Sequence, residues 1–555
     1  MTIRSTALLL FASLLGAQTY DTILLNGRVM DGTGGAWFLG DVAIKGDRIA
    51  TIKPAGMLRE ASAKRRIDAA GHVIAPGFID IQSHVRSDLL GRGDGRLMSK
   101  VTQGITTEIM GENDSNAPFN ERVREMSGAD TFRFGRFSEW LSAMEQHRSS
   151  SNFGSFIGAA TLRAYGKGMS MGKAAPSEVQ AMRQAAGQAM RDGAYGIASA
   201  LIYPPGSYAG TKELIEVVKA IAPYGGVYIS HIRSEGDRLL EAIDEAIEIG
   251  RQAQVPVEIY HLKAVSEQNW PKMPLAIQKI DAARARGLDV QANMYPYTAS
   301  GTGLTACLPD WTAADGKLYE NLGNPALRAR LLTEMMKPDD TWESRCLQAT
   351  PAGVLLVGLR RPQHQKYVGK RLSEVAASMG KPWPEAVLAL LVAERQRIAT
   401  IYFMLSEENL ALQLKQPWIK IATDAGGSTP ETGEAPVHPR TYGTYPRVLG
   451  KYTRDQGVMP MEEAVRKMTS AVANRLSIFD RGLLREGLMA DIVVFDPAKV
   501  IDRATFEQPH QISAGIPYVF VNGTLVVDEG KHTGALPGRV MRGPGYRPAL
   551  AKPIN

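Results

Sequence analysis

The sequence lacks most of the features that would assign it to a specialised class of protein. Its 555 residues contain two cysteines, Cys307 and Cys346, and no low-complexity tract. The cysteines lack the spacing of a metal knuckle, so they either form one disulfide after export or remain free. The 64 basic and 57 acidic residues leave a formal net charge of +7 but are interspersed. Without a basic block alternating with aromatics, we expect no nucleic-acid binding.

Apolar runs long enough to cross a membrane are also missing. The longest candidate extends from Ala7 to Leu15, after Arg4 and before the small residues Gly16 and Ala17. This is the pattern of a secretory signal peptide, and the run is too short to span a bilayer. The alternative is a frayed or buried terminal segment. We expect residues 1–17 to be a signal peptide, the mature protein to be periplasmic or secreted, and no membrane insertion.

Short strand-like runs separated by glycine-containing turns occur at both ends of the chain. DTILLNGRVMDG and DVAIKGDRIATI lie near the N-terminus, and ADIVVFDP and PYVFVNGTLVVDEGK near the C-terminus. The overall composition, 44% hydrophobic and 22% charged, is that of a globular protein. We therefore expect residues 18–75 and 481–545 to form one small β-sandwich that the middle of the chain interrupts.

Between residues 76 and 480, apolar strands alternate with amphipathic helices. GITTEIMG, VYISH and VEIYH are short strand-like runs, whereas SEVQAMRQAAGQAMRDG and EAIDEAIEIGRQA have helical spacing. Repeated βα units predict a parallel sheet in an α/β fold, and their number favours a closed (β/α)₈ barrel of the TIM type. The stretch of about 302–393 breaks the alternation, so we interpret it as an insertion.

Polar residues follow several of these apolar strands. In a (β/α)₈ barrel, catalytic groups lie at the carboxyl ends of the strands. A lone histidine is more often a surface or satisfied core residue, which is how we interpret His72, His147, His364, His510 and His532. Three strand-end histidines with two carboxylates instead predict a metal site, because imidazole and carboxylate are good zinc ligands. The strand-end set is Gln82, His84, Glu112, His231, His261 and Asp424.

Longer motifs occur in order over about residues 20–530: PGFIDIQSH, TQGITTEIMGE, LIYPPGSYAGTKEL, SHIRSEGD, HLKA, YPYTAS, TDAGG and HPRTYGTYPRVLGKY. With them the chain resembles the N-acyl-D-amino-acid deacylase (D-aminoacylase) family of the amidohydrolase superfamily. The resemblance implies a (β/α)₈ barrel beside a β-sandwich, zinc at the barrel mouth, and hydrolysis of small N-acyl amino acids.

The resemblance also implies roles for individual residues. It makes His231 and His261 zinc ligands, and Asp424 the base that later acts as acid. It assigns the substrate carboxylate to Tyr203, Lys263 and Arg440, and cations with hydrogen-bonding groups are a sensible carboxylate clamp. Without the resemblance, these last three would pass for an ordinary aromatic, a solvated lysine and a surface arginine.

Two positions depart from the family pattern. The usual His-x-His is Gln82-Ser83-His84 here, and the stretch with a cysteine ligand is Gly111-Glu112-Asn113-Asp114. Glu112 can replace the cysteine, whereas Glu108 should lie inside its strand. We predict one tight zinc on Glu112, His231 and His261, and a weak or empty second site at His84 and Asp424. His84 could instead hydrogen-bond the oxyanion or the water.

Two rival functions remain open at this point. One is another amidohydrolase reaction, on cyclic amides or dipeptides, of the hydantoinase or isoaspartyl dipeptidase type. The other is a non-catalytic exported binding protein on an amidohydrolase scaffold, suggested by Gln82 and the missing cysteine. The preferred side chain, the acyl group and the oligomeric state carry no sequence signal.

Overall fold

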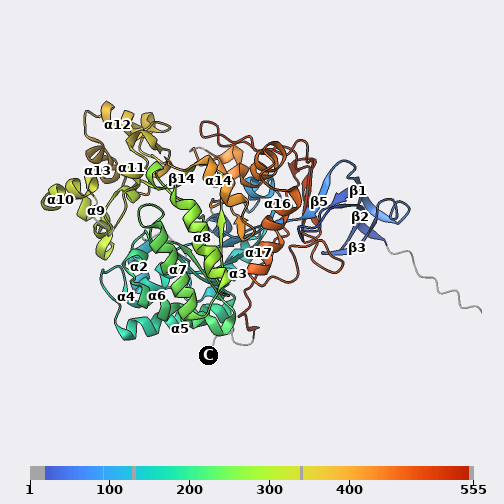
Figure 1. Cartoon of the computed structure of the whole chain (residues 1–555), viewed down its shortest axis with the longest axis horizontal. Coiled ribbons are helices and arrows are strands. Elements are labelled where there is room, and N and C mark those ends of the chain that lie inside the picture. The colour runs from blue at the N-terminus through green and yellow to red at the C-terminus, as the bar shows by residue number, and fades with distance from the viewer. Residues whose placement is uncertain (1–18, 92, 128–132, 338–341, 434–435, 549–555) are drawn as a thin grey trace, which may run out of the picture.

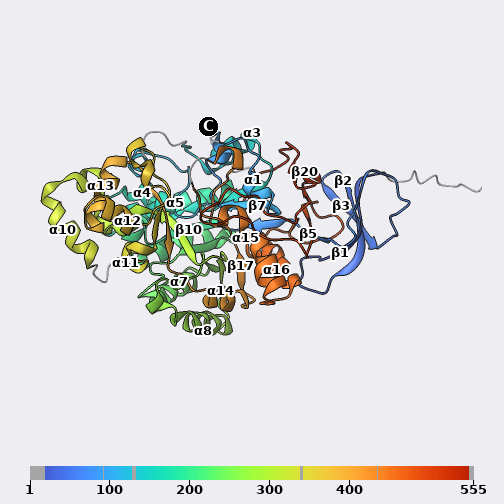
Figure 2. The same ribbon diagram turned by 90° about the horizontal axis from the view of Figure 1, so that it is seen from above.

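The computed structural model describes residues 19–91, 93–127, 133–337, 342–433 and 436–548. The expected signal peptide, residues 1–17, lies outside this range. In both views the molecule is elongated, with strands β1, β2 and β3 at one end and helices α10, α12 and α13 at the other (Figures 1 and 2). None of the helices within the described residues combines the length and apolarity that a membrane crossing requires.

Strands from both ends of the chain share one nine-stranded sheet in the order β21-β20-β19-β18-β5-β1-β2-β3, with β4 beside β1. The ends meet where β18 pairs antiparallel with β5, which sets Val494 opposite Ile74. Apolar residues from both ends of the chain form one buried core cluster, which includes Leu24, Ile74, Ile492 and Phe520. The strands are Tyr20–Val29 (β1), Phe38–Lys45 (β2), Arg48–Pro54 (β3), Ala63–Asp68 (β4), Val73–Pro76 (β5), Ile492–Phe495 (β18), Tyr518–Val521 (β19), Thr524–Asp528 (β20) and Lys531–His532 (β21).

The middle of the chain forms parallel strands, one set ordered β6-β7-β8 and the other β17-β13-β12-β11-β10-β9. The two sets meet twice. Only Phe156 separates β8 from β9, and beyond β6 and β17 a parallel bridge joins Ser83 to Ala425. The strands are Phe78–Asp80 (β6), Ile105–Met110 (β7), Asn152–Ser155 (β8), Ile157–Gly158 (β9), Gly196–Ala200 (β10), Val227–His231 (β11), Val257–Ile259 (β12), Val290–Met294 (β13) and Ile419–Ile421 (β17).

Helices connect these parallel strands, as their apolar spacing predicts. In α7, Leu239, Ile243, Ala246 and Ile247 are buried on one face. Helix α5 ends before Gly193, whose φ of 114° suits glycine. The helices are Met98–Val101 (α1), Glu121–Ser127 (α2), Phe137–His147 (α3), Ala159–Lys167 (α4), Pro176–Asp192 (α5), Thr211–Val218 (α6), Leu239–Ala253 (α7), Lys272–Ala285 (α8), Glu407–Leu414 (α14), Arg440–Arg447 (α15), Met461–Met468 (α16) and Ser470–Arg475 (α17).

The region of the expected insertion contains an antiparallel sheet, β14-β16-β15, whose strands β14 and β16 lie partly or wholly outside residues 302–393. It packs in a second apolar core cluster that also includes Val265, Tyr295 and Tyr297. A disulfide joins Cys307 to Cys346, whose Cα atoms are 5.1 Å apart, so the two cysteines are paired rather than free. The elements are Ala299–Gly303 (β14), Leu318–Gly323 (α9), Pro325–Met336 (α10), Arg345–Gln348 (α11), Val354–Leu356 (β15), Leu372–Ser378 (α12), Trp383–Glu394 (α13) and Ala399–Phe403 (β16).

A buried lysine ties together three parallel strands. Lys100 Nζ donates to Asp80 Oδ2 on β6 at 2.9 Å and to Thr423 Oγ1, just beyond β17, at 2.6 Å. It also lies 3.6 Å from Glu108 on β7, and burial raises the pKa of Glu108 to about 7. Glu108 therefore lies inside its strand, as the sequence predicts. The same three strands lead to His84, Glu112 and Asp424.

Replacing Lys100 by Met should lower the free energy of unfolding by about 3–5 kcal/mol, because the change leaves two buried carboxylates without their cation. Denaturant titration followed by circular dichroism would measure this. Lys64→Met is the matched control, since Lys64 pairs with Asp21 at the surface and exposed pairs stabilise little. Equal stability of the two variants would contradict a structural role for the buried cluster.

Candidate metal centre and active site

Three strand-end side chains converge on one point. Glu112 follows β7, His231 ends β11, and His261 follows β12. Glu112 Oε1 lies 3.2 Å from His231 Nδ1 and 3.3 Å from His261 Nε2. The two imidazole rings are perpendicular, with centroids 4.4 Å apart.

These distances fit a tetrahedral zinc ion. Zinc bonds of about 2.0–2.1 Å place two tetrahedral ligands about 3.4 Å apart, close to both measured separations. Burial opposes ionisation of Glu112, but the nearby His261 and hydrogen bonds from both histidines hold the pKa of Glu112 well below its usual value. The carboxylate is thus in the charged form that a metal ligand requires.

A second group of possible ligands shares Glu112. Its other oxygen, Oε2, lies 3.4 Å from His84 Nε2, which is itself 2.9 Å from Asp424 Oδ1. Gln82 Nε2 donates to the same Oε2 at 2.5 Å. Ligand atoms of His84, Glu112 and Asp424 lie within 4.8 Å of one another. Each carboxylate oxygen of Glu112 therefore faces a different group of possible ligands. The oxygen that faces the second group, Oε2, also accepts the hydrogen bond from the Gln82 amide.

Asp424 is held between a histidine and an arginine. Arg440 Nη1 lies 2.7 Å from Asp424 Oδ2. Burial alone would raise the pKa of Asp424, but the Arg440 cation and the His84 hydrogen bond lower it below its usual value. The backbone N–H of Arg440 donates to His438 Nδ1 at 3.1 Å. Asp424 and His261 have positive φ values of 50° and 32°, a left-handed conformation that is uncommon for residues other than glycine.

The three residues that the family resemblance assigns to the substrate carboxylate also lie here. Tyr203, Lys263 and Arg440 line a cavity of about 580 Å³ that contains both ligand groups. The Tyr203 hydroxyl shares a 2.6 Å hydrogen bond with Thr302. Lys263 donates to Glu235 and lies 2.7 Å from His261 Nδ1. Lys263 and Arg440 thus already contact internal carboxylates, so their role toward a substrate stays a prediction.

The remaining histidines take no part in this cavity, apart from His438. His364 pairs with Glu394, and His532 bonds Ser150. His72 and His147 bond backbone carbonyl oxygens, and His510 bonds Tyr442. Their surroundings agree with the ordinary structural role expected for them.

Comparison with known proteins assigns the chain to a family. Residues 422–527 match the model of the amidohydrolase family. A D-aminoacylase from Alcaligenes xylosoxydans xylosoxydans is 35% identical over 533 residues, which cover 95% of this chain and 98% of that protein. The chain belongs to the D-aminoacylase family. The resemblance read from the motifs is thereby confirmed.

Solved structures of family members superpose well on the chain. A D-aminoacylase structure that addresses a binuclear metal centre, with one-metal activation and second-metal attenuation, has a TM-score of 0.79 at 34% identity, covering 94% of this chain and all of that one. Another is an N-acyl-D-glutamate deacylase from Bordetella bronchiseptica, complexed with zinc and a phosphonate that mimics the tetrahedral intermediate. Its TM-score is 0.78 at 29% sequence identity, and the match covers 95% of this chain and 100% of that one. The chain thus has the fold of D-aminoacylases.

Sequence reasoning missed two residues of this D-aminoacylase-family site. Glu235 lies behind the histidines, with Oε2 3.5 Å from His231 Nε2 and Oε1 3.2 Å from His261 Nδ1. Arg345, from the insertion, lies 2.7 Å from Glu235 Oε2. Glu235 therefore contacts the ring nitrogen of each histidine that faces away from Glu112. Such partners fix the orientation of metal-binding imidazoles.

Replacing Glu235 by Gln should weaken zinc binding about 10–100-fold, because the neutral amide no longer orients and polarises both imidazoles. Competition with a chromogenic chelator would measure the affinity. Glu343→Gln is the matched control, since Glu343 lies 3.9 Å from Arg345 and pairs with neither histidine. Unchanged affinity in the Glu235 variant would show that the carboxylate plays no part in the metal centre.

Proposed function

We propose that this chain is a zinc-dependent hydrolase that cleaves the amide bond of N-acyl-D-amino acids. The observation that carries the proposal is the Glu112, His231 and His261 group, with tetrahedral spacing beside Asp424. The names of its relatives support the substrate class, since they include a D-aminoacylase and an N-acyl-D-glutamate deacylase. The substrate is a small molecule.

The chain's own residues would divide the reaction among them. Zinc, when bound, polarises the acyl carbonyl and acidifies water. Asp424 accepts the proton of the attacking water and returns it to the leaving nitrogen. Arg440 keeps Asp424 ionised before attack, and His84, 2.9 Å from Oδ1, orients the carboxylate. Arg440 and Lys263 also supply positive charge for the substrate carboxylate, with the Tyr203 hydroxyl beside them.

We propose one tight zinc and a weak or empty second site. The first site offers a carboxylate and two imidazoles, all buried or nearly so. The second offers Asp424, already paired with Arg440, and His84, with Gln82 in the place of a stronger imidazole ligand. A family structure described by one-metal activation and second-metal attenuation supports this division.

We further propose that the parallel strands close into a (β/α)₈ barrel, and that the sheet of the two termini folds as the flanking β-sandwich. The Ser83–Ala425 bridge and the short break at Phe156 support closure, because they join the two parallel sets at both edges. The core shared by the two termini supports the sandwich.

The disulfide supports export, since disulfides persist in oxidising compartments.

The direct test is an assay of zinc-loaded protein on paired N-acetyl-D- and N-acetyl-L-amino acids, with hydantoins and dipeptides alongside. We expect hydrolysis of the D-isomers. Asp424→Asn should lower turnover about 10²–10⁴-fold, the usual contribution of a general base, while zinc stays bound.

Asp455→Asn serves as the control, because Asp455 pairs with Arg454 at the surface. Activity on hydantoins or dipeptides alone would favour the first rival function. No hydrolysis of any amide, with zinc bound, would favour a binding protein. Full turnover by the Asp424 variant would show that another group moves the proton.

A further inference from the structure

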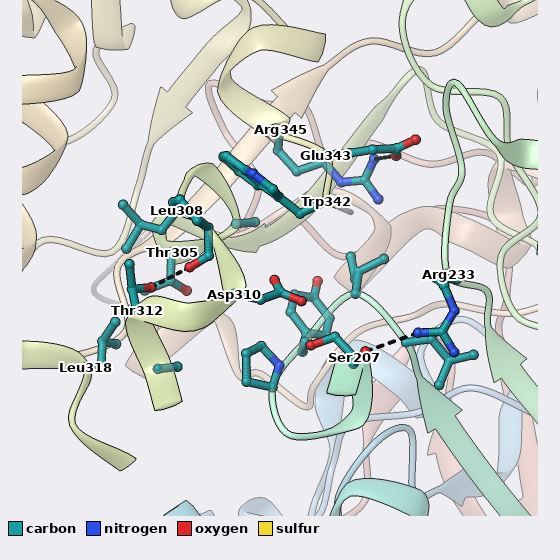
Figure 3. A pocket seen from close by; sticks show the side chains of 17 residues that line it. Ser207, Arg233, Thr305, Leu308, Asp310, Thr312, Leu318, Trp342, Glu343 and Arg345 are labelled. Atoms are coloured by element: carbon teal, nitrogen blue, oxygen red, sulfur yellow. Dashed lines mark hydrogen bonds and ion pairs between the residues drawn. The ribbon is translucent and has the colours of Figure 1, made fainter. Parts of the chain in front are cut away.

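A second cavity, of about 230 Å³, adjoins the active-site cavity between the loop after β10 and the insertion (Figure 3). Ile202, Tyr203, Thr305 and Arg345 line both spaces. The Tyr203 ring also lies edge-on to His231, with centroids 5.6 Å apart. These shared residues form the boundary that a substituent of a substrate at the metal group would pass to enter the smaller cavity.

Most of its walls are apolar. Leu201 comes from the barrel side, and Leu308, Leu318 and Trp342 come from the insertion. Such a surface accepts an alkyl stem, because removing apolar area from water stabilises the complex. The smaller cavity thus has the character of a binding site for a chain-like group.

One carboxylate that lines this cavity, that of Asp310, forms no ion pair within the described residues. In Figure 3, the Asp310 side chain projects into the space among the lining residues. Within the described residues no basic side chain forms an ion pair with Asp310, although the nearby charge of Arg233 and the Ser207 hydroxyl favour its ionised form. Burial raises the pKa of Asp310 to about 6, so it is largely ionised at neutral pH.

The other charges that line the cavity are already matched. Arg233 forms a two-pronged pair with Glu245, with both N–O distances 2.9 Å. Arg345 pairs with Glu235 at 2.7 Å, and Glu343 accepts from Ser234 at 2.5 Å and lies 3.9 Å from Arg345. Among the charged residues that line the cavity, Asp310 is therefore the one without an ion pair of its own in the described part of the chain.

We propose that this cavity binds a cationic substituent of the substrate, an alkyl stem ending in an ammonium group that pairs with Asp310. The proposal rests on the proposed function and narrows its substrate class. A charge-assisted hydrogen bond is strong where water is displaced, and Trp342 can hold the stem or the cation over its ring. The same charge would repel an acidic substituent. The ammonium can belong to the amino-acid side chain or to the acyl group.

The test compares kcat/KM within two matched pairs of substrates, each differing by one terminal amine. N-acetyl-D-lysine against N-acetyl-D-norleucine probes the side chain, and 6-aminohexanoyl-D-methionine against hexanoyl-D-methionine probes the acyl group. In the unaltered protein, kcat/KM of the amine-bearing substrate should exceed that of its apolar partner about tenfold or more in one of the two pairs. This is the size of effect expected for a hydrogen bond to a charged group. Asp310→Asn should bring that ratio close to one.

Asp315→Asn is the control, because Asp315 is exposed in the same segment and does not line the cavity. If the Asn variant does not fold, as judged by thermal unfolding, Asp310→Ser repeats the charge removal. Ratios that do not depend on Asp310 overturn this inference while the hydrolase function stands. If the unaltered protein hydrolyses none of the four substrates, the proposed function itself fails, and the inference with it.

Discussion

The single negative charge of Glu112 is shared between two groups of ligand atoms. One oxygen faces His231 and His261, and the other faces His84 and the amide of Gln82. Asp424, the other acid of the second group, is already neutralised by Arg440. Two divalent ions would therefore compete for one unmatched charge, and their repulsion over a short distance is strong in a site with little water. This constraint favours a centre built around one ion.

Two buried charge networks hold that centre in shape. On one side, Lys100 joins the strands that lead to His84, Glu112 and Asp424. On the other, Glu235 contacts the two imidazoles that face Glu112 and is neutralised by Lys263 and Arg345. Buried ion pairs stabilise little by themselves, but removing one partner is costly. Their contribution here is to fix the position of ligands that come from separate strands.

Much of this site could be predicted from the sequence, because parallel strands bring their carboxyl ends to one edge. Glu112, His231, His261 and Asp424 each follow an apolar run, so the pattern alone places them together. Glu235 could not be predicted in the same way. It follows His231 in a polar loop, where an acid that orients a ligand looks like any solvated acid.

Arg345 carries no local signal either, because its partner Glu235 is 110 residues away along the chain. The start of the insertion was equally hard to place. Strand β14, ASGTG, is too small and polar to show a strand pattern, and it pairs with β16, which lies about 100 residues further along the chain. The positions of Arg345 and β14 thus depend on tertiary contacts, which leave no local pattern in the sequence.

Anomalous diffraction at the zinc absorption edge, on crystals of zinc-loaded and dialysed protein, tests the one-ion centre most directly. We predict one strong peak about 2 Å from Glu112 Oε1, His231 Nδ1 and His261 Nε2, with at most a weak peak near His84. Two peaks of equal strength, or a peak remote from Glu112, would contradict a centre limited by the charge of one carboxylate.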